Sequence, residues 1–485
     1  MYLGLDVGTS SVKAVLLDGN DHIIAVASEG LTVSRPHPNW SEQNADDWWT
    51  ATLAAVDELA KLHPQAVAEI AGIGLSGHMH GATLLGKDGT VLRPCILWND
   101  GRSGAECLEL EAKFPELHQV TGNLAMPGFT APKLMWVKKH EPEIFAKVAM
   151  VLLPKAYVRY KLTGEYAEDM SDASGTLWLD PAKRDWSDAA LAATDLTRAQ
   201  MPRLVEGSEP SGMLSAELTA RWGLKKPAVV AGGAGDNAAT AVGLGAITPG
   251  DSFLSLGTSG VLWVTTDRFA PNPASAVHAF AHCVPATWHQ MGVMLAAAAS
   301  LAWWAEVTGR SEKDLMDELG EAPQGASKVL FLPYLSGERT PANDPSLRGV
   351  FAGLGAGSSR ADLTRAVLEG VAHAVRDNRD ALAAAGTSVK EIDIVGGGSR
   401  SRLWAQIIAD MLEIPVHRVE EGTVGAAFGA ARLGRLAATG EAPAAVCHRA
   451  RRLETFTPDP ARAASFTESH AIWRRLAPFA KEISQ

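Results

Sequence analysis

The sequence has few cysteines, no excess of positive charge and no long apolar run. Its four cysteines form no C-x-x-C pair and no cluster with histidine at zinc spacing, so neither a disulfide framework nor a structural zinc site is expected. The formal net charge of −11 argues against binding to nucleic acid, which needs a basic surface. The longest apolar stretch, residues 292–305, is too short to cross a bilayer, and we expect it to form a buried helix.

The length excludes a single hydrophobic core. A chain of 485 residues normally divides into two or three domains. The sequence starts directly with strand-like alternation, MYLGLDVG, and shows neither the basic segment nor the cleavage site of a signal peptide. Together with the scattered cysteines, this start predicts a cytoplasmic protein without a membrane partner.

Two pairs of segments repeat about half a chain apart. Residues 6–18 read DVGTSSVKAVLLD and residues 255–267 read SLGTSGVLWVTTD, with six identical positions. A second pair, residues 235–246 and 422–434, consists of helices dense in Gly and Ala, which can approach each other closely. Duplication of a whole α/β unit explains both pairs. We therefore expect domains at residues 1–245 and 246–440, followed by a helical tail, residues 441–485, packed on the second domain.

The two Gly-Thr-Ser turns are candidates for phosphate binding. Glycine lets the backbone approach a phosphate closely, and the hydroxyl and N–H groups that follow can donate to its oxygens. A single such turn is usually structural, but two related copies could hold one polyphosphate from both sides. The residues assigned to this nucleotide site are Thr9, Ser10, Lys13, Gly257 and Thr258.

Asp6 distinguishes the first turn from the second, where Ser255 takes its place. One carboxylate beside phosphates suits Mg²⁺, which binds one or two carboxylates and keeps several waters. We therefore expect Asp6 to hold Mg²⁺, directly or through water. Lys13 lies only on the first hairpin, and the alternative for it is a solvated surface lysine.

Asp236 begins a predicted helix after an apolar strand, residues 228–231, and a glycine-rich loop. A helix cap is the ordinary explanation of an Asp at such a place. Here the flanking glycines leave it open to a cleft at the carboxyl end of a strand, where ligands of α/β proteins bind. Phosphoryl transfer to a hydroxyl needs a carboxylate that accepts the proton, and Asp236 is the candidate for this catalytic base.

A third glycine-rich loop lies between the strand and the helix of residues 391–410, with Gly397, Gly398 and Arg402 as candidates for contact with adenosine. A plain strand-to-helix turn is the alternative. The loop is not the dinucleotide fingerprint G-x-G-x-x-G, and no G-x-x-x-x-G-K-[ST] motif occurs.

A polar group in the first half suits a polyhydroxyl ligand. Residues 74–85 and 96–102 bring together histidine, methionine, tryptophan and asparagine. Metal binding by the two histidines is not expected, because no third ligand has the right spacing. A buried structural histidine is the other alternative. The candidates for sugar binding are Met79, His80, Trp98 and Asn99.

Five motifs in this order resemble the actin/hexokinase/Hsp70 superfamily: DVGTS, GAGDNAATAVG, SLGTS, VGGGSRS and GTVGAAFGAARLG. Within it, the chain is similar to the FGGY carbohydrate kinases over nearly its full length. The further segments that match are residues 40–49, 76–85, 97–102, 126–143, 152–165, 169–180 and 331–341. Two positions depart from the family pattern, Ala156 and Ala342.

The resemblance implies two RNase H-like domains with Mg-ATP in the cleft between them. It places Asp236 at the proton acceptor, Asp6 near Mg²⁺ and the Met79-His80 pair at the sugar, with Asn237, Trp98 and Asn99 close by. The implied activity is ATP-dependent phosphorylation of D-xylulose. The alternatives are another ketose or polyol, such as ribulose or glycerol, or a regulator that binds sugar and ATP without catalysis. A homodimer and a monomer remain equally open.

Overall fold

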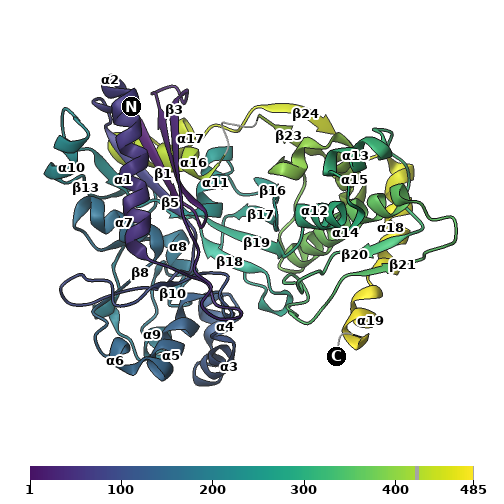
Figure 1. The fold of residues 1–485 in the computed structure, drawn as a ribbon, viewed down its shortest axis with the longest axis horizontal. Helices are drawn as coiled ribbons and strands as arrows, with labels where there is room; N and C mark the ends of the chain where they lie inside the picture. Colours follow the sequence, from purple (N-terminus) through teal and green to yellow (C-terminus); the bar gives the residue numbers. More distant parts are fainter. Residues whose placement is uncertain (421–424, 484–485) are drawn as a thin grey trace.

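The computed structural model describes residues 1–420 and 425–483, which form two α/β lobes side by side (Figure 1). The first lobe is built on a sheet with the strand order β13-β14-β5-β1-β2-β3. β1, β2 and β3 are antiparallel neighbours, whereas β5 and β14 run parallel to β1. The bounds of these strands are β1 (Tyr2–Val7), β2 (Ser11–Leu17), β3 (Ile23–Gly30), β5 (Gly72–Gly77), β13 (Pro210–Met213) and β14 (Val229–Ala231).

The second lobe repeats this arrangement. Its sheet has the order β18-β19-β17-β16-β22-β23-β24, and β16 lies between an antiparallel and a parallel neighbour as β1 does. The five central strands of both sheets therefore follow the same order, which confirms the duplicated α/β fold. The bounds are β16 (Ser252–Leu256), β17 (Gly260–Thr266), β18 (His278–Ala281), β19 (Trp288–Met294), β22 (Ile392–Val395), β23 (Val416–Val419) and β24 (Arg452–Phe456).

Helices cover the faces of both sheets. The strand-like start of the sequence is confirmed as β1, and the first helix, α1 (Ala45–Leu62), follows β3 and a short strand, Glu42–Gln43. Between β5 and β14, the chain of the first lobe forms a large group of short helices. The helices used below are α5 (Thr130–His140), α7 (Pro154–Thr163), α8 (Met170–Ser174), α9 (Asp188–Ala193), α11 (Asp236–Leu244), α12 (Ala298–Thr308), α13 (Glu312–Leu319), α15 (Arg402–Leu412), α16 (Ala426–Thr439), α17 (Pro443–Val446) and α18 (Pro460–Trp473). None of the helices in the described ranges has the length and apolar composition needed to cross a membrane.

The prediction of one buried helix over residues 292–305 is wrong. Gly292 and its next two neighbours belong to β19, which pairs with β17, and α12 begins only at Ala298. A Cβ on Gly292 would lie 2.1 Å from Asn378 Oδ1, so this position of the strand needs glycine for close packing. A short apolar run cannot distinguish a buried strand from a buried helix, and small residues make the distinction harder.

α16 lies against the first sheet, although its sequence belongs to the second half. Cβ atoms on Gly4 and Gly74 would come within 1.9 and 1.8 Å of α16 carbonyl oxygens, so the helix backbone touches β1 and β5 directly. A Cβ on Gly429 would likewise lie 1.8 Å from the carbonyl oxygen of Ala239 in α11. The predicted close approach of the two Gly/Ala-rich helices is confirmed. Residues 422–424 of the second motif lie outside the described residues.

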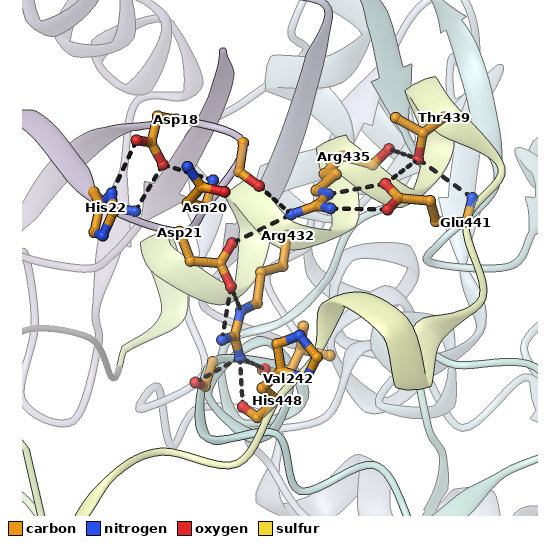
Figure 2. A network of polar contacts seen from close by, with 12 residues as sticks. Asp18, Asn20, Asp21, His22, Val242, Arg432, Arg435, Thr439, Glu441 and His448 are labelled. Carbon is orange, nitrogen blue, oxygen red and sulfur yellow. Dashed lines mark hydrogen bonds and ion pairs between the residues drawn. The ribbon is translucent and has the colours of Figure 1, made fainter.

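Arg432 fastens α16 to three other segments of the first lobe (Figure 2). Its guanidinium donates to the carbonyl oxygens of Val242, Gly243 and His448 at 3.0, 3.1 and 3.1 Å. Its Nη2 also lies 2.9 Å from a carboxylate oxygen of Asp21 in the turn between β2 and β3. The buried arginine thus joins the end of α11, the β2–β3 turn and the segment after α17.

The domain boundaries at residues 245 and 440 stay predictions. α16 belongs to the second half of the sequence but packs on the sheet of the first lobe, so the two lobes do not coincide with the two halves of the sequence. The segment after residue 440 is not wholly helical, because β24 pairs with β23 in the second sheet. α18 packs on α15, and its Phe466 and Trp473 are buried in the second core.

Candidate active site

The two Gly-Thr-Ser turns join the first two strands of each sheet. In the first, the Gly8 N–H donates to the carbonyl oxygen of Ser11 at 3.0 Å. In the second, the start of α12 donates to the carbonyl oxygens of Gly257 and Thr258 at 2.8 and 2.9 Å. The first turn is therefore closed through the Gly8 N–H and the second is held through its carbonyl groups, while the hydroxyls of Ser10 and Thr258 stay at the surface. This geometry leaves donors free for an anionic ligand.

Asp6 and Lys13 face each other across β1 and β2. Asp6 Oδ1 is buried and has no hydrogen-bond partner among the described residues. Burial raises the pKa of Asp6, although Ser76 and Lys13 act in the opposite direction. An unpaired buried carboxylate is costly unless a cation or donor accompanies it. Asp6 therefore fits a Mg²⁺ ligand, and the exposed Lys13 remains a predicted phosphate contact.

Asp236 is the first residue of α11 and not its cap, which is Gly235. Burial, and next the negative charge of Asp6, raise the pKa of Asp236 to about 6. Asp236 Oδ1 accepts hydrogen bonds from the backbone and side-chain nitrogens of Asn237 at 2.7 and 2.9 Å. Oδ2 accepts none from the part of the chain that the structure describes. A carboxylate with one oxygen held and the other open suits a general base.

Met79 packs on Gly235, the residue before Asp236, and His80 packs on Gly175. A Cβ on Gly235 would lie 2.8 Å from Met79 Sδ. His80 Nδ1 lies 2.7 Å from the carbonyl oxygen of Gly175, so Nδ1 carries the proton. Burial lowers the pKa of His80 to about 3, so the ring is neutral and its Nε2 is an acceptor for a hydroxyl group.

Sequence reasoning missed the residues that hold this loop in place. His80 has φ +71°, and its carbonyl oxygen accepts hydrogen bonds from Lys133 Nζ at 2.9 Å and Thr130 Oγ1 at 3.1 Å. Both donors come from α5, within the matched segment of residues 126–143. Their spacing alone carries no sign of this contact. The buried Lys133 also donates to the carbonyl oxygen of Gly128 at 2.8 Å.

Trp98 connects the predicted sugar group with the first turn, since its Nε1 donates to Thr9 Oγ1 at 3.1 Å. Asn99 beside it is exposed, and its contact with a sugar stays a prediction. The other histidine of the motif, His78, packs edge-on against Trp48 with 5.4 Å between ring centroids. His78 and His80 thus have separate environments.

A cavity of about 730 Å³ lies where the third glycine-rich loop meets α12 and α13. Its size suits a nucleoside, and Gly397, Gly398 and Arg402 contribute to its wall. Arg402 is held at 2.5 Å from Glu454 on β24. The residues of α13 that line the opposite wall were not predicted, because an amphipathic surface helix carries no nucleotide motif: Glu312, Lys313, Met316 and Asp317.

Gly397→Val is expected to raise the KM for ATP by at least about tenfold. A Cβ on Gly397 would meet nothing within 4 Å, so the new side chain would occupy the cavity without disturbing the protein. The measurement is KM for ATP together with the thermal midpoint Tm, which should not change. An unchanged KM for ATP would show that this cavity is not the nucleoside site.

Comparison with known proteins agrees with these features. Residues 1–243 match the N-terminal domain, and residues 253–438 the C-terminal domain, of the FGGY family of carbohydrate kinases. The chain is 49% identical over 478 residues to the xylulose kinase of Escherichia coli, covering 98% of each. It is 38% identical over 435 residues to the xylulose kinase of Bacillus subtilis, covering 89% of this chain and 87% of that one.

Solved structures agree with this relationship. A xyloylose kinase from Brucella ovis shares 52% identity with a TM-score of 0.98, and each chain is covered to 99%. The xylulose kinase from Rhodospirillum rubrum shares 31% identity with a TM-score of 0.92, covering 100% of this chain and 99% of that one. The chain therefore belongs to the FGGY family of carbohydrate kinases.

Proposed function

We propose that this chain transfers the terminal phosphoryl group of ATP to D-xylulose, giving D-xylulose 5-phosphate and ADP. The observation that carries the proposal is Asp236, a carboxylate with one open oxygen and a raised pKa, directly after Gly235, on which Met79 packs. The names of the similar proteins support the choice of sugar.

In the proposed mechanism, the ketose lies against Met79 and His80, and Nε2 of the neutral His80 accepts a hydrogen bond from one hydroxyl. Asp236 Oδ2 accepts the proton of the attacking hydroxyl as the new oxygen–phosphorus bond forms. Asn237 keeps Oδ1 in place, so that the open oxygen points to the acceptor. The two turns bind the phosphates, and closure of the two lobes around the substrates would exclude water and limit hydrolysis of ATP.

Mg²⁺ would be held by Asp6, directly or through water, and would supply positive charge at the phosphates. This assignment rests on the unpaired buried Oδ1 of Asp6. The adenosine would occupy the cavity beside Gly397 and Gly398.

The test is a coupled assay of ADP release with a panel of ketoses and polyols, including D-xylulose, ribulose and glycerol, each with and without Mg²⁺. D-Xylulose should give the highest kcat/KM, and activity should disappear with EDTA. A higher kcat/KM for ribulose or glycerol would change the proposed substrate but would leave the proposed kinase activity standing. No turnover with any sugar would refute the proposal.

The pH dependence follows from the raised pKa of Asp236. The base works only when it is ionised, and its pKa is about 6. We therefore expect kcat/KM for the sugar to increase about tenfold per pH unit below pH 6 and to level off above about pH 7. A profile measured from pH 4.5 to 8.5 tests this. Full activity at pH 5 would contradict the buried environment of the carboxylate.

We also propose that the protein works in the cytoplasm, because its four cysteines are free and buried, as in a reducing compartment. A homodimer and a monomer are the alternatives for the oligomeric state, and sedimentation analysis distinguishes them.

A further inference from the structure

Two segments that match the family, residues 152–165 and 169–180, contribute only the Gly175 carbonyl group to the site described above. They meet behind the site in a buried group of charged side chains on α7 and on the strand and helix that follow it. The members are Lys155, Arg159, Glu168, Asp169 and Asp172, each at most 1% exposed.

Lys155 is the centre of this group. Its Nζ lies 2.6 Å from Asp169 Oδ2 and 3.1 Å from Asp172 Oδ2, and it also contacts Glu168. Burial alone would lower the pKa of Lys155, but the three carboxylates, Asp169 foremost, raise it above its ordinary value. The ammonium group therefore stays charged and serves as the cation among these carboxylates.

A chain of hydrogen bonds leads from this group to the catalytic loop. Asp169 Oδ1 accepts hydrogen bonds from the Ser171 hydroxyl at 2.5 Å and from the Ser171 backbone at 2.8 Å. Ser171 Oγ in turn accepts the backbone N–H of Gly235 at 3.1 Å. Gly235 is the residue immediately before Asp236.

The same loop has a second attachment, because the Arg159 guanidinium donates to the carbonyl oxygen of Gly232. Between these two points the chain reads Gly-Gly-Ala-Gly, which has little conformational preference of its own. Ala234 and Gly235 pair with β5, and Ser171 and Arg159 add contacts to this loop from the side chains behind the site.

We propose that Ser171, held by Asp169 and Lys155, is a positioning residue that keeps Asp236 in reach of the acceptor hydroxyl. Lys155 fixes Asp169, Asp169 fixes the Ser171 hydroxyl, and the hydroxyl fixes Gly235. A displacement of the base by about 1 Å is enough to slow a reaction about a hundredfold. This inference rests on the proposed function, since it assigns Ser171 a part in the same reaction.

The test compares Ser171→Ala with Ser174→Ala under saturating ATP and D-xylulose. Both serines are buried on α8, but the Ser174 hydroxyl accepts the N–H of Ala281 on β18 and has no link to Gly235. Ser171→Ala should lower kcat about tenfold to a hundredfold with the KM for ATP unchanged, whereas Ser174→Ala should stay within about twofold of the wild type.

Ser171→Ala should also displace the acid limb of the pH profile, because burial, the largest cause of the raised pKa of Asp236, depends on the position of this loop. Ser171→Cys keeps nearly the same volume with weaker hydrogen bonds, and it serves if the alanine variant does not fold. Its kcat should also decrease. Equal kcat in wild type and either folded Ser171 variant, with an unchanged pH profile, would overturn the inference. An inactive wild type would instead refute the proposed function.

Discussion

Asp236→Asn is expected to lower kcat for D-xylulose by about a thousandfold while binding of ATP stays unchanged. Asparagine has nearly the same shape and can keep its contact with Asn237, but it cannot accept the proton of the sugar hydroxyl. General base catalysis contributes about 10² to 10⁴ in rate, so the residual activity should lie in this range below the wild type. The measurement is steady-state kinetics together with a binding isotherm for ATP.

The same substitution should leave the protein at least as stable as the wild type above pH 6. The pKa of Asp236 is about 6 in the folded chain, above the ordinary value of a carboxyl in an unfolded chain. Its ionised form therefore costs stability as the pH rises through 6, and asparagine removes this cost. Without Mg²⁺, the Tm of the variant should exceed that of the wild type at pH 8, and the difference should vanish below about pH 4.

Asp188→Asn is the matched control, since Asp188 also occupies the first position of a helix, α9, but pairs with Arg198 at the surface. Its kcat should equal that of the wild type. Asp236→Asn with more than a few per cent of wild-type activity would refute the assignment of the base.

Gly74→Ala is expected to cause the largest loss of stability. A Cβ at this position would lie 1.8 Å from the carbonyl oxygen of Ala430 in α16, and neither β5 nor the helix backbone can yield without moving the other. Overpacking of this kind costs about 1–3 kcal/mol and sometimes more. We expect a Tm several degrees lower and a reduced yield of folded protein. Thermal unfolding by circular dichroism measures both.

Gly30→Ala is the control on the same sheet, because a Cβ there would meet nothing within 4 Å. Its Tm should stay within about 1 °C of the wild type. A Gly74→Ala protein as stable as this control would show that α16 does not lie against β5 in solution.

The sequence predicted the structure correctly where a motif is contiguous in the chain and occurs in both halves. The paired hairpins predicted the duplicated sheet, because a strand-turn-strand motif is contiguous in the chain. The placement of Asp236 at the start of α11 was predicted correctly for the same reason, since strand, glycine loop and helix follow one another. The assigned roles of the site residues stay predictions that the experiments above address.

What could not be predicted depends on contacts between distant segments. Ser171 meets Gly235 across 64 positions, and Lys133 meets the His80 carbonyl across 53, with no periodic pattern in either case. The wall of the nucleoside cavity on α13 likewise comes from an ordinary amphipathic helix. Of the two departures from the family pattern, Ala156 is fully buried in α7 and Ala342 is exposed.

The position of α16 also affects the order in which the chain can fold during synthesis. The strands of the first sheet leave the ribosome early, but the helix that covers their glycine-lined face is made only after residue 425. Until then this face lacks α16, and the Arg432 anchor to Asp21 is still missing. The N-terminal lobe is therefore completed only after residues 426–439 have been synthesised, and a helix from the second half of the sequence closes the first lobe.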